Sequence, residues 1–261
     1  TKNRDGSLIF QIDKEKVLKM LAERARGAGA ELRYNTYVTG LVKENDFVRG
    51  VMVGRNEVRA TVVLSAEGLP RKLSNEAGLF AEKPSSFFVI LCVYLENLKL
   101  HENDLGQKST LGSAYSSLPK ATGTLHSLGH NKAMIVFGVL LSENKWSHSG
   151  RLTDYLDAYV SRVSWISELC HKGTITGRKG CWILLQKPKA LVTNGFVGIG
   201  DTVAPLGHSS NAIAMLMGKE AAVTVSNAQQ KSDASSEALS DYNKWLKSKL
   251  FSGVEFEAKL I

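Results

Sequence analysis

A short apolar run that ends in a carboxylate is the part of this sequence best suited to chemistry. Residues 195–201 read Gly-Phe-Val-Gly-Ile-Gly-Asp, which predicts a buried strand with Asp201 at its end. A turn rich in Gly and Ser follows, and residues 212–227 have the pattern of a helix with a small-residue face. The carboxylate can accept hydrogen bonds from a polyol, and the free amides at a helix start favour an anion.

The glycine before Asp201 and the turn after it supply most of the other candidate binding residues. We expect the following groups to face a ligand that carries both a polyol and a negative charge: Gly200, Pro205, Gly207, His208, Ser209, Ser210 and Asn211. For Asp201 the alternative is a simple cap or turn aspartate. For His208 the alternative is a loop histidine satisfied by its neighbours.

Composition and charge narrow the class of protein. The 261 residues are 43% hydrophobic and 22% charged, as in ordinary globular proteins, and no apolar run is long enough to span a membrane. The polar start lacks the apolar core of a secretion signal, so we expect a cytoplasmic protein. The net charge of +8 favours acidic partners, including an anionic membrane surface, although a mildly basic surface without a specific partner is the alternative.

Nucleic-acid and metal binding are not expected. The chain has no nucleic-acid motif and no basic stripe with stacking aromatics. Cys92, Cys170 and Cys181 lack metal-like spacing and predict isolated thiols. His126 and His130 are four residues apart, but the strand-like texture around them argues against a metal pair on a helix.

The spacing of apolar residues predicts two textures along the chain. In the first, Asp13 caps a helix over 14–26, and the other elements are strands at 7–12, 31–35, 37–43, 47–53 and 57–65 and a short helix at 69–73. In the second, the strands are aromatic and β-branched, as in an antiparallel sheet, at 87–97, 111–118, 122–128 and 133–141. Helices at 150–161, 163–171 and 235–250 and a strand at 182–186 complete the prediction.

Three segments in order resemble flavoproteins of the aromatic-hydroxylase type. Ala66-Glu67-Gly68 is similar to their Ala-Asp-Gly passage, and the strands at 123–127 and 131–139 look like the substrate domain of geranylgeranyl reductases and FixC-type quinone oxidoreductases. Gly200-Asp201 before the small-faced helix is similar to their second flavin motif. The family's Gly-x-Gly-x-x-Gly turn is absent, which implies either a fragment or a second chain that supplies it.

The resemblance implies an α/β (α+β) fold, with an incomplete Rossmann-like domain that binds FAD and an inserted antiparallel sheet for the substrate. The expected boundaries are 1–80 and 187–230 for the FAD-binding domain, 81–186 for the sheet and 231–261 for a helical end. Asp201 would contact the ribityl chain, the amides of 207–211 would face the flavin ring, and Ala66 and Gly68 would complete the cofactor site.

The implied activity is reduction of isoprenoid double bonds, or electron passage between an acidic carrier and a quinone. A non-catalytic binding or assembly subunit and an aromatic hydroxylase are the alternatives. No catalytic residue is assigned. The wide side chains of the sheet would line an apolar pocket or, alternatively, fill the core: Phe87, Phe88, Tyr94, Tyr115, Leu125, Met134, Phe137 and Trp182.

Overall fold

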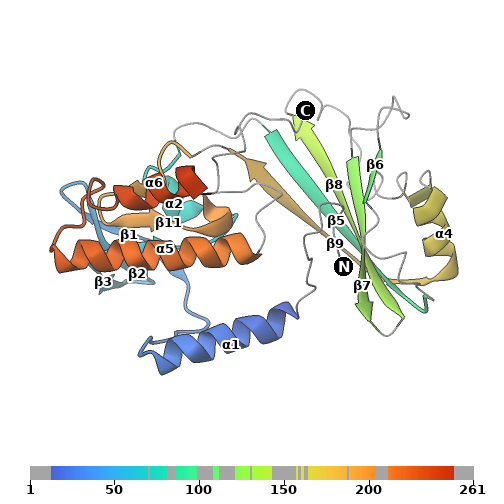
Figure 1. The fold of residues 1–261 in the computed structure, drawn as a ribbon, viewed down its shortest axis with the longest axis horizontal. Coiled ribbons are helices and arrows are strands. Elements are labelled where there is room, and N and C mark those ends of the chain that lie inside the picture. The colour runs from blue at the N-terminus through green and yellow to red at the C-terminus, as the bar shows by residue number, and fades with distance from the viewer. Residues whose placement is uncertain are drawn as a thin grey trace. The chain divides into compact units, whose positions relative to one another are not determined.

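The computed structural model describes most of the chain, namely residues 13–69, 71–80, 86–98, 108–111, 121–129, 131–142, 157, 160–161, 164–186, 188–203 and 211–249. Residue contacts divide it into two compact units, one of 1–36 with 88–182 and the other of 37–87 with 183–261. Both units combine helices with sheets (Figure 1), so the predicted mixed α/β class is confirmed. Each unit is described by itself.

The first unit is built on a sheet of five strands, four of them long. The order across the sheet is β6-β7-β8-β5-β9, and β6, β7 and β8 pair antiparallel. The strands are β5 (Ser86–Glu96), β6 (Lys108–Leu111), β7 (Ala121–Gly129), β8 (Lys132–Ser142) and β9 (Thr174–Leu185). The last strand begins eight residues before the predicted 182–186. Its first part was missed because it contains glycines and basic residues, which are uncommon in strands.

Helix α4 (Ser164–Lys172) covers one face of this sheet. Ile166 is fully buried against it, and Leu169 and Cys170 pack beside that residue. Alternate residues of the strands point to this face, as the period of two requires. Together with Leu98, which follows β5, they form one apolar core: Val89, Leu91, Val93, Leu95, Leu125, Ala133, Ile135 and Phe137.

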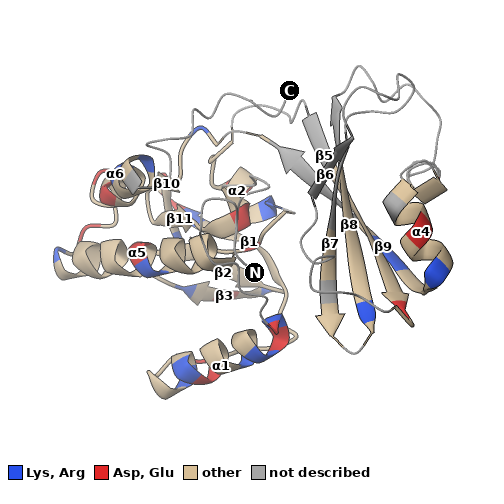
Figure 2. Ribbon diagram, turned by 45° about the vertical axis from the view of Figure 1, so that its right-hand side comes forward, with Lys and Arg blue, Asp and Glu red and all other residues tan. Residues whose placement is uncertain are grey.

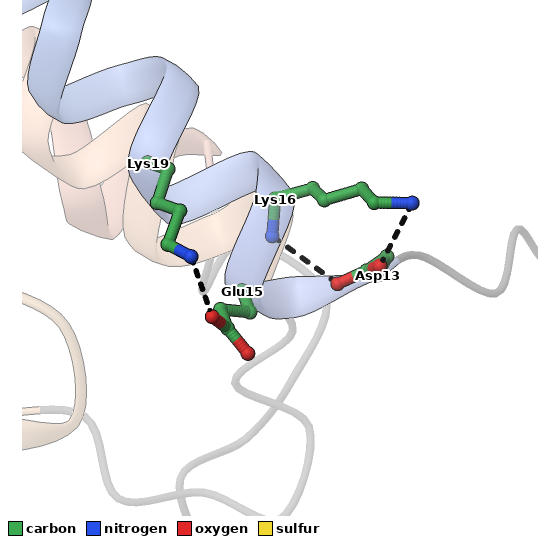
Figure 3. A network of polar contacts seen from close by, with 4 residues as sticks. All are labelled: Asp13, Glu15, Lys16 and Lys19. Carbon is green, nitrogen blue, oxygen red and sulfur yellow. Dashed lines mark hydrogen bonds and ion pairs between the residues drawn. The ribbon is translucent and has the colours of Figure 1, made fainter.

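Helix α1 (Lys14–Gly27) begins where the sequence predicts. Asp13 Oδ1 accepts a hydrogen bond from Lys16 N at 3.1 Å, and Glu15 pairs with Lys19 at 2.7 Å (Figure 3). No residue of α1 is buried, although its apolar residues share one side. The predicted strand at 31–35 is wrong, since this stretch forms a turn with Asn35 at φ +52°. The predicted strand at 7–12 lies outside the described residues.

The second unit contains two three-stranded sheets. The antiparallel meander consists of β1 (Val38–Glu44), β2 (Phe47–Val53) and β3 (Asn56–Arg59). The other sheet has the order β10-β11-β4, made of Val192–Thr193, Phe196–Gly198 and Val63–Ser65. β11 runs antiparallel to β10 and parallel to β4. The predicted single strand at 57–65 is therefore two strands in two sheets.

Four helical elements lie among the described residues of this unit. They are α2 (Lys72–Glu76), the short 3-10 helix η3 (Gly200–Thr202), α5 (Asn211–Gln230) and α6 (Ser240–Lys249). The core of the unit joins buried residues of α5 and α6, including Met217, Ala221, Tyr242 and Leu246, to Phe196 and Val197 of β11. The long helix predicted after the Gly-Asp motif is thus confirmed as α5. The last helix, α6, begins five residues later than predicted, and α2 begins three residues after the start of the predicted 69–73 helix.

Candidate functional site

The two motifs that the sequence singles out meet at the ends of two neighbouring strands. β4 leads into Ala66-Glu67-Gly68, and β11 leads through Ile199 into the Gly200–Thr202 turn. Because the strands are parallel, both turns lie at the carboxyl edge of the sheet, where open α/β folds bind their ligands. Two hydrogen bonds join them: Ile199 N donates to Ser65 O at 2.8 Å, and Gly68 N donates to Thr202 Oγ1 at 2.8 Å.

Glu67 holds the first of these turns in shape. Its carboxylate accepts hydrogen bonds from Leu73 N at 3.0 Å and from Ser74 N and Oγ at 2.8 and 2.9 Å. These amides belong to the first turn of α2, where backbone N–H groups lack helical partners. Glu67 is thus committed to the protein's own backbone. This role could not be predicted from the sequence, because the carboxylate bonds to residues six and seven positions further along the chain.

A buried cation lies beside the second turn. Arg71 is 0% exposed, adopts φ +46°, and stacks its guanidinium 4.9 Å from the ring centre of Phe80. Burial lowers the pKa of Arg71, and the negative charge of Asp201 acts in the opposite direction. Asp201 itself is exposed. The site therefore presents a solvent-facing carboxylate near a fixed positive charge, an arrangement that sequence inspection missed.

Helix α5 starts close to the same turn. A Cβ built on Gly200 would lie 3.6 Å from Ala214 Cβ, which places the first turn of the helix next to η3. Asn211, its first residue, is exposed, as is Ala66. Gly68 has φ +72°, and a Cβ built there meets no atom within 4 Å, so space remains beside this turn. Pro205, Gly207, His208, Ser209 and Ser210 lie outside the described residues.

The five-stranded sheet separates the candidate pocket residues onto two faces. Leu125 and Phe137 are each 2% exposed in the core beneath α4, so for these two residues the core-packing alternative is confirmed. Tyr94 and Met134 occupy alternate positions and are half-buried on the other face. There, Lys179 Nζ lies 5.9 Å from the ring centre of Tyr94. The side chains of Phe87, Phe88, Tyr115 and Trp182 are outside the described residues.

Among the residues that the structure describes, the remaining titratable candidates do not gather into a second site. His126 is exposed on β7, and partial desolvation lowers its pKa, while His130 lies outside the described residues. Cys170 is a half-buried free thiol, and Cys92 is half-buried as well. Within the described ranges, no three His, Cys or acidic side chains come together as metal ligands would. Among the described helices, none has both the length and the apolar character needed to cross a membrane.

Curated relatives by sequence are archaeal reductases. The chain is 28% identical over 250 residues to a digeranylgeranylglycerophospholipid reductase of Methanocella arvoryzae, an alignment that covers 90% of this chain and 59% of the relative. It is 32% identical over 168 residues to the protein of that name in Methanosarcina mazei, with 60% and 39% covered. No family model matches the chain. The resemblance to geranylgeranyl reductases is confirmed, and the chain spans about three fifths of the first relative's length.

Solved structures show which fold this is. The flavin-dependent brominase Bmp2 superposes with a TM-score of 0.71 at 16% identity, over 91% of this chain and 61% of that chain. A flavoprotein/dehydrogenase from Cytophaga hutchinsonii gives a TM-score of 0.63 at 15% identity, over 94% and 58%. Both similarities cover nearly all of this chain and only part of the other. The fold is therefore that of a large part of an FAD-type flavoprotein.

Proposed function

We propose that this chain forms part of an FAD-dependent oxidoreductase that reduces isoprenoid double bonds of a lipid. The observation that carries the proposal is the meeting of two turns, Ala66–Gly68 and Gly200–Thr202, at one edge of a sheet, joined by the Gly68–Thr202 hydrogen bond of 2.8 Å. Such an edge is where α/β folds place a dinucleotide. The reductase of Methanocella arvoryzae, whose match covers 90% of this chain, supports the same conclusion.

The residues present fit a flavin nucleotide. The exposed Asp201 carboxylate would accept hydrogen bonds from ribityl hydroxyls. The space beside Gly68 would leave room for the cofactor. The amide-rich start of α5 at Asn211, with Pro205, Gly207, His208, Ser209 and Ser210 before it, would favour the side of the flavin that becomes negative. Ala66 and Gly200 complete the site. Bound FAD supplies the hydride chemistry, and these groups bind and orient it.

The substrate is proposed to be a polyprenyl lipid with an anionic head group. The relatives' name specifies a digeranylgeranyl phospholipid, and the net charge of +8 suits a phosphate or an anionic membrane surface. The half-buried side chains on the face of the five-stranded sheet away from α4, such as Tyr94 and Met134, would contact the apolar chain. The same positive charge would attract an acidic electron carrier that delivers electrons to the flavin.

Other flavoprotein activities have less support. Flavin-dependent halogenases share the fold at 17% identity or below, which carries no information about the reaction. The sequence similarity to reductases favours a reductase over an aromatic hydroxylase, and an FAD-loaded chain without activity would indicate a non-catalytic subunit. Phenol-stimulated oxidation of NADPH would favour the hydroxylase over the reductase.

Flavin binding tests the proposal directly. The chain, produced with whatever polypeptide co-purifies, is titrated with FAD while flavin fluorescence is followed. We expect Asp201→Ala to weaken FAD binding by about 10-fold or more, since a charged hydrogen-bond acceptor is lost. Asp241→Ala is the matched control, because Asp241 is an exposed aspartate of α6 that pairs with Lys244 at 2.8 Å.

Product analysis tests the reaction. The flavin-loaded protein, reduced chemically, is mixed with a digeranylgeranyl phospholipid, and mass spectrometry follows the gain of two hydrogens for each double bond reduced. Unchanged lipid together with tight FAD binding would reject the isoprenoid substrate and keep the flavoprotein. Equal FAD binding by the wild type and Asp201→Ala would reject the proposed cofactor site.

A further inference from the structure

A buried threonine joins the two turns of the candidate site. Gly68 and Thr202 are 134 positions apart in sequence, and Gly68 N donates a hydrogen bond to Thr202 Oγ1 at 2.8 Å. Thr202 is 0% exposed, so water does not compete for this bond. The backbone pairing of β4 with β11 ends at Ser65 and Gly198, and Ile199 N still donates to Ser65 O. Past that point, the threonine side chain is what connects one turn to the other.

The same bond sets the direction of Asp201. The 3-10 helix η3 is a single turn, in which successive side chains point about 120° apart. Because Thr202 is turned inward to Gly68, Asp201 is turned outward, where it is exposed. The turn is closed by Val203 N, which donates to Gly200 O at 3.1 Å, and Val203 is 1% exposed. The position of the carboxylate is therefore tied to the hydroxyl of its neighbour.

The Ala66–Gly68 turn is attached on both sides. On one side, Glu67 accepts a hydrogen bond from Ser74 N of α2 at 2.8 Å. On the other side, the N–H of Gly68 is used by Thr202, while a Cβ built on Gly68 meets no atom within 4 Å. Gly68 thus offers space to a ligand, and its N–H serves the protein. Loss of either attachment would let the turn move relative to that space.

The neighbouring start of α5 adds amides without charge. A Cβ on Gly200 would lie 3.6 Å from Ala214 Cβ, so the helix begins beside η3. The helix carries no charged side chain before Lys219 (Figure 2). Asp201 is therefore the acidic residue that η3 and the first half of α5 bring to this edge. The placement of its carboxylate decides which hydroxyls of a polyol it can reach.

We propose that Thr202 is a positioning residue of the flavin site. Its buried hydroxyl clamps the Ala66–Gly68 turn to the Gly200–Thr202 turn, and so places the Asp201 carboxylate for the ribityl chain. The inference rests on the proposed function for the identity of the ligand. Thr202 acts through its neighbours, since its side chain is buried and bonded to the protein's own backbone. Bound flavin should in return stabilise the clamp, because coupling between two sites is reciprocal.

Hydrogen exchange at Gly68 tests the clamp without flavin. Thr202→Val keeps the branched side chain and removes the hydroxyl, whereas Thr202→Ser keeps the hydroxyl. We expect Thr202→Val to speed exchange of the Gly68 amide by about 10-fold or more, and Thr202→Ser to stay within about 3-fold of the wild type. Thr224→Val is the matched control, because it removes the hydroxyl of another buried threonine, 3% exposed on α5. Unchanged exchange in Thr202→Val, or equal acceleration by Thr224→Val, would overturn the clamp.

FAD titration tests whether Thr202 acts through Asp201. The chain, with whatever polypeptide co-purifies, should lose about 10-fold in FAD affinity with Thr202→Val and no more than about 3-fold with Thr202→Ser or Thr224→Val. In the Asp201→Ala background, Thr202→Val should have little further effect, because the carboxylate that it places is gone. An equal loss in both backgrounds would reject the positioning role. Circular dichroism verifies that each variant folds.

The wild-type protein provides a measurement that needs no substitution. Saturating FAD should slow exchange of the Gly68 amide by about 10-fold or more, and an unchanged rate with FAD bound would overturn the inference. This inference and the proposed function fail in different ways. A wild-type chain that binds no FAD would reject the proposed function and the ligand named here. FAD binding that Thr202→Val leaves at the wild-type level would reject the positioning role and keep the flavoprotein.

Discussion

The two units contain sheets of opposite design. The five-stranded sheet has strands of 11, 9, 11 and 12 residues in β5, β7, β8 and β9, and its core is filled by its own residues and α4. In the β10-β11-β4 sheet the strands have only two or three residues. Long paired strands hold each other in place, whereas strands this short depend on the residues that surround them.

The contacts around the short strands show this dependence. Val48 N donates to Asn194 O at 2.9 Å, Gly195 N donates to Ala234 O at 2.7 Å, and Lys189 N donates to Leu79 O at 2.7 Å. Each bond joins segments far apart in sequence. The candidate cofactor turns extend from these short strands, so their geometry is set by distant parts of the second unit. The site is therefore predicted to respond to substitutions that lie well outside it.

Two glycines provide the largest expected contrast. Gly195 has φ +72°, and a Cβ there would lie 2.1 Å from Val48 O, a backbone atom. Gly195→Ala should therefore lower the free energy of unfolding by more than about 4 kcal/mol, because it strains the backbone and pushes the new Cβ against β2. At Gly180 of β9 the Cβ would meet Leu91 Cδ2 at 2.9 Å, a side-chain end that can move. Gly180→Ala should cost about 1 kcal/mol.

Chemical denaturation with circular dichroism measures both values. A large loss of stability from Gly180→Ala, or a small one from Gly195→Ala, would contradict the view that close backbone contacts fix the β10-β11-β4 sheet. Gly54→Ala serves as a check on backbone strain alone, because Gly54 has φ +62° and no atom within 4 Å of a built Cβ. Its cost should be about 1–2 kcal/mol.

Core truncations test whether the units unfold separately. Met217→Ala removes a fully buried side chain of α5 from the second core, and Ile135→Ala removes one that is 1% exposed from the first. Each should cost about 3 kcal/mol. Calorimetry should show Met217→Ala lowering one thermal transition and Ile135→Ala lowering another. A single transition that both substitutions lower equally would mean that the two cores unfold together.

The sequence predicts the long elements well and the short ones poorly. Asp13 and the residues after it mark α1 correctly, and the small residues after Gly200-Asp201 predict α5. The aromatic runs mark β5, β7 and β8 within two residues. In contrast, 57–65 looks like one strand because the bend at 60–62 has no glycine or proline, and β10 is too short to show any period.

The candidate site, too, could be predicted only in part from the sequence. The pairing of Ala66-Glu67-Gly68 with Gly200-Asp201 follows from the resemblance, and the hydrogen bond between Gly68 and Thr202 brings the two motifs together. The roles of Glu67 and Arg71 could not be predicted from the sequence. Glu67 accepts hydrogen bonds from a helix that begins further along the chain, and Arg71 itself has a left-handed backbone conformation. A buried arginine also contradicts the average exposure of its type.

Glu67 allows a test of how the turn beside the candidate site is held in place. Glu67→Ala leaves two amides and a hydroxyl of α2 without their acceptor, so it should destabilise the protein by about 2 kcal/mol. Glu57→Ala is the control, since Glu57 makes only an exposed ion pair with Arg59 at 2.8 Å, which contributes little to stability. Thermal melts compare the two, and equal effects would reject the capping role.

Tyr242 should give the smallest effect, and one of opposite sign. Its ring is 0% exposed on α6, and its hydroxyl has no hydrogen-bond partner among the described residues. Tyr242→Phe removes a buried polar atom and keeps the ring, so stability should stay the same or rise by up to about 1 kcal/mol.

The pH dependence of this variant separates the hydroxyl from the ring. Burial, with the nearby charge of Glu220, raises the pKa of Tyr242 above its ordinary value of 10.0. The folded protein then keeps a proton that the unfolded chain releases, so its free energy of unfolding should fall as pH rises above about 10. Tyr242→Phe should remove that part of the slope. Denaturation at pH 9 and above measures it, and identical slopes would mean that Tyr242 ionises as readily in the folded protein as in the unfolded chain.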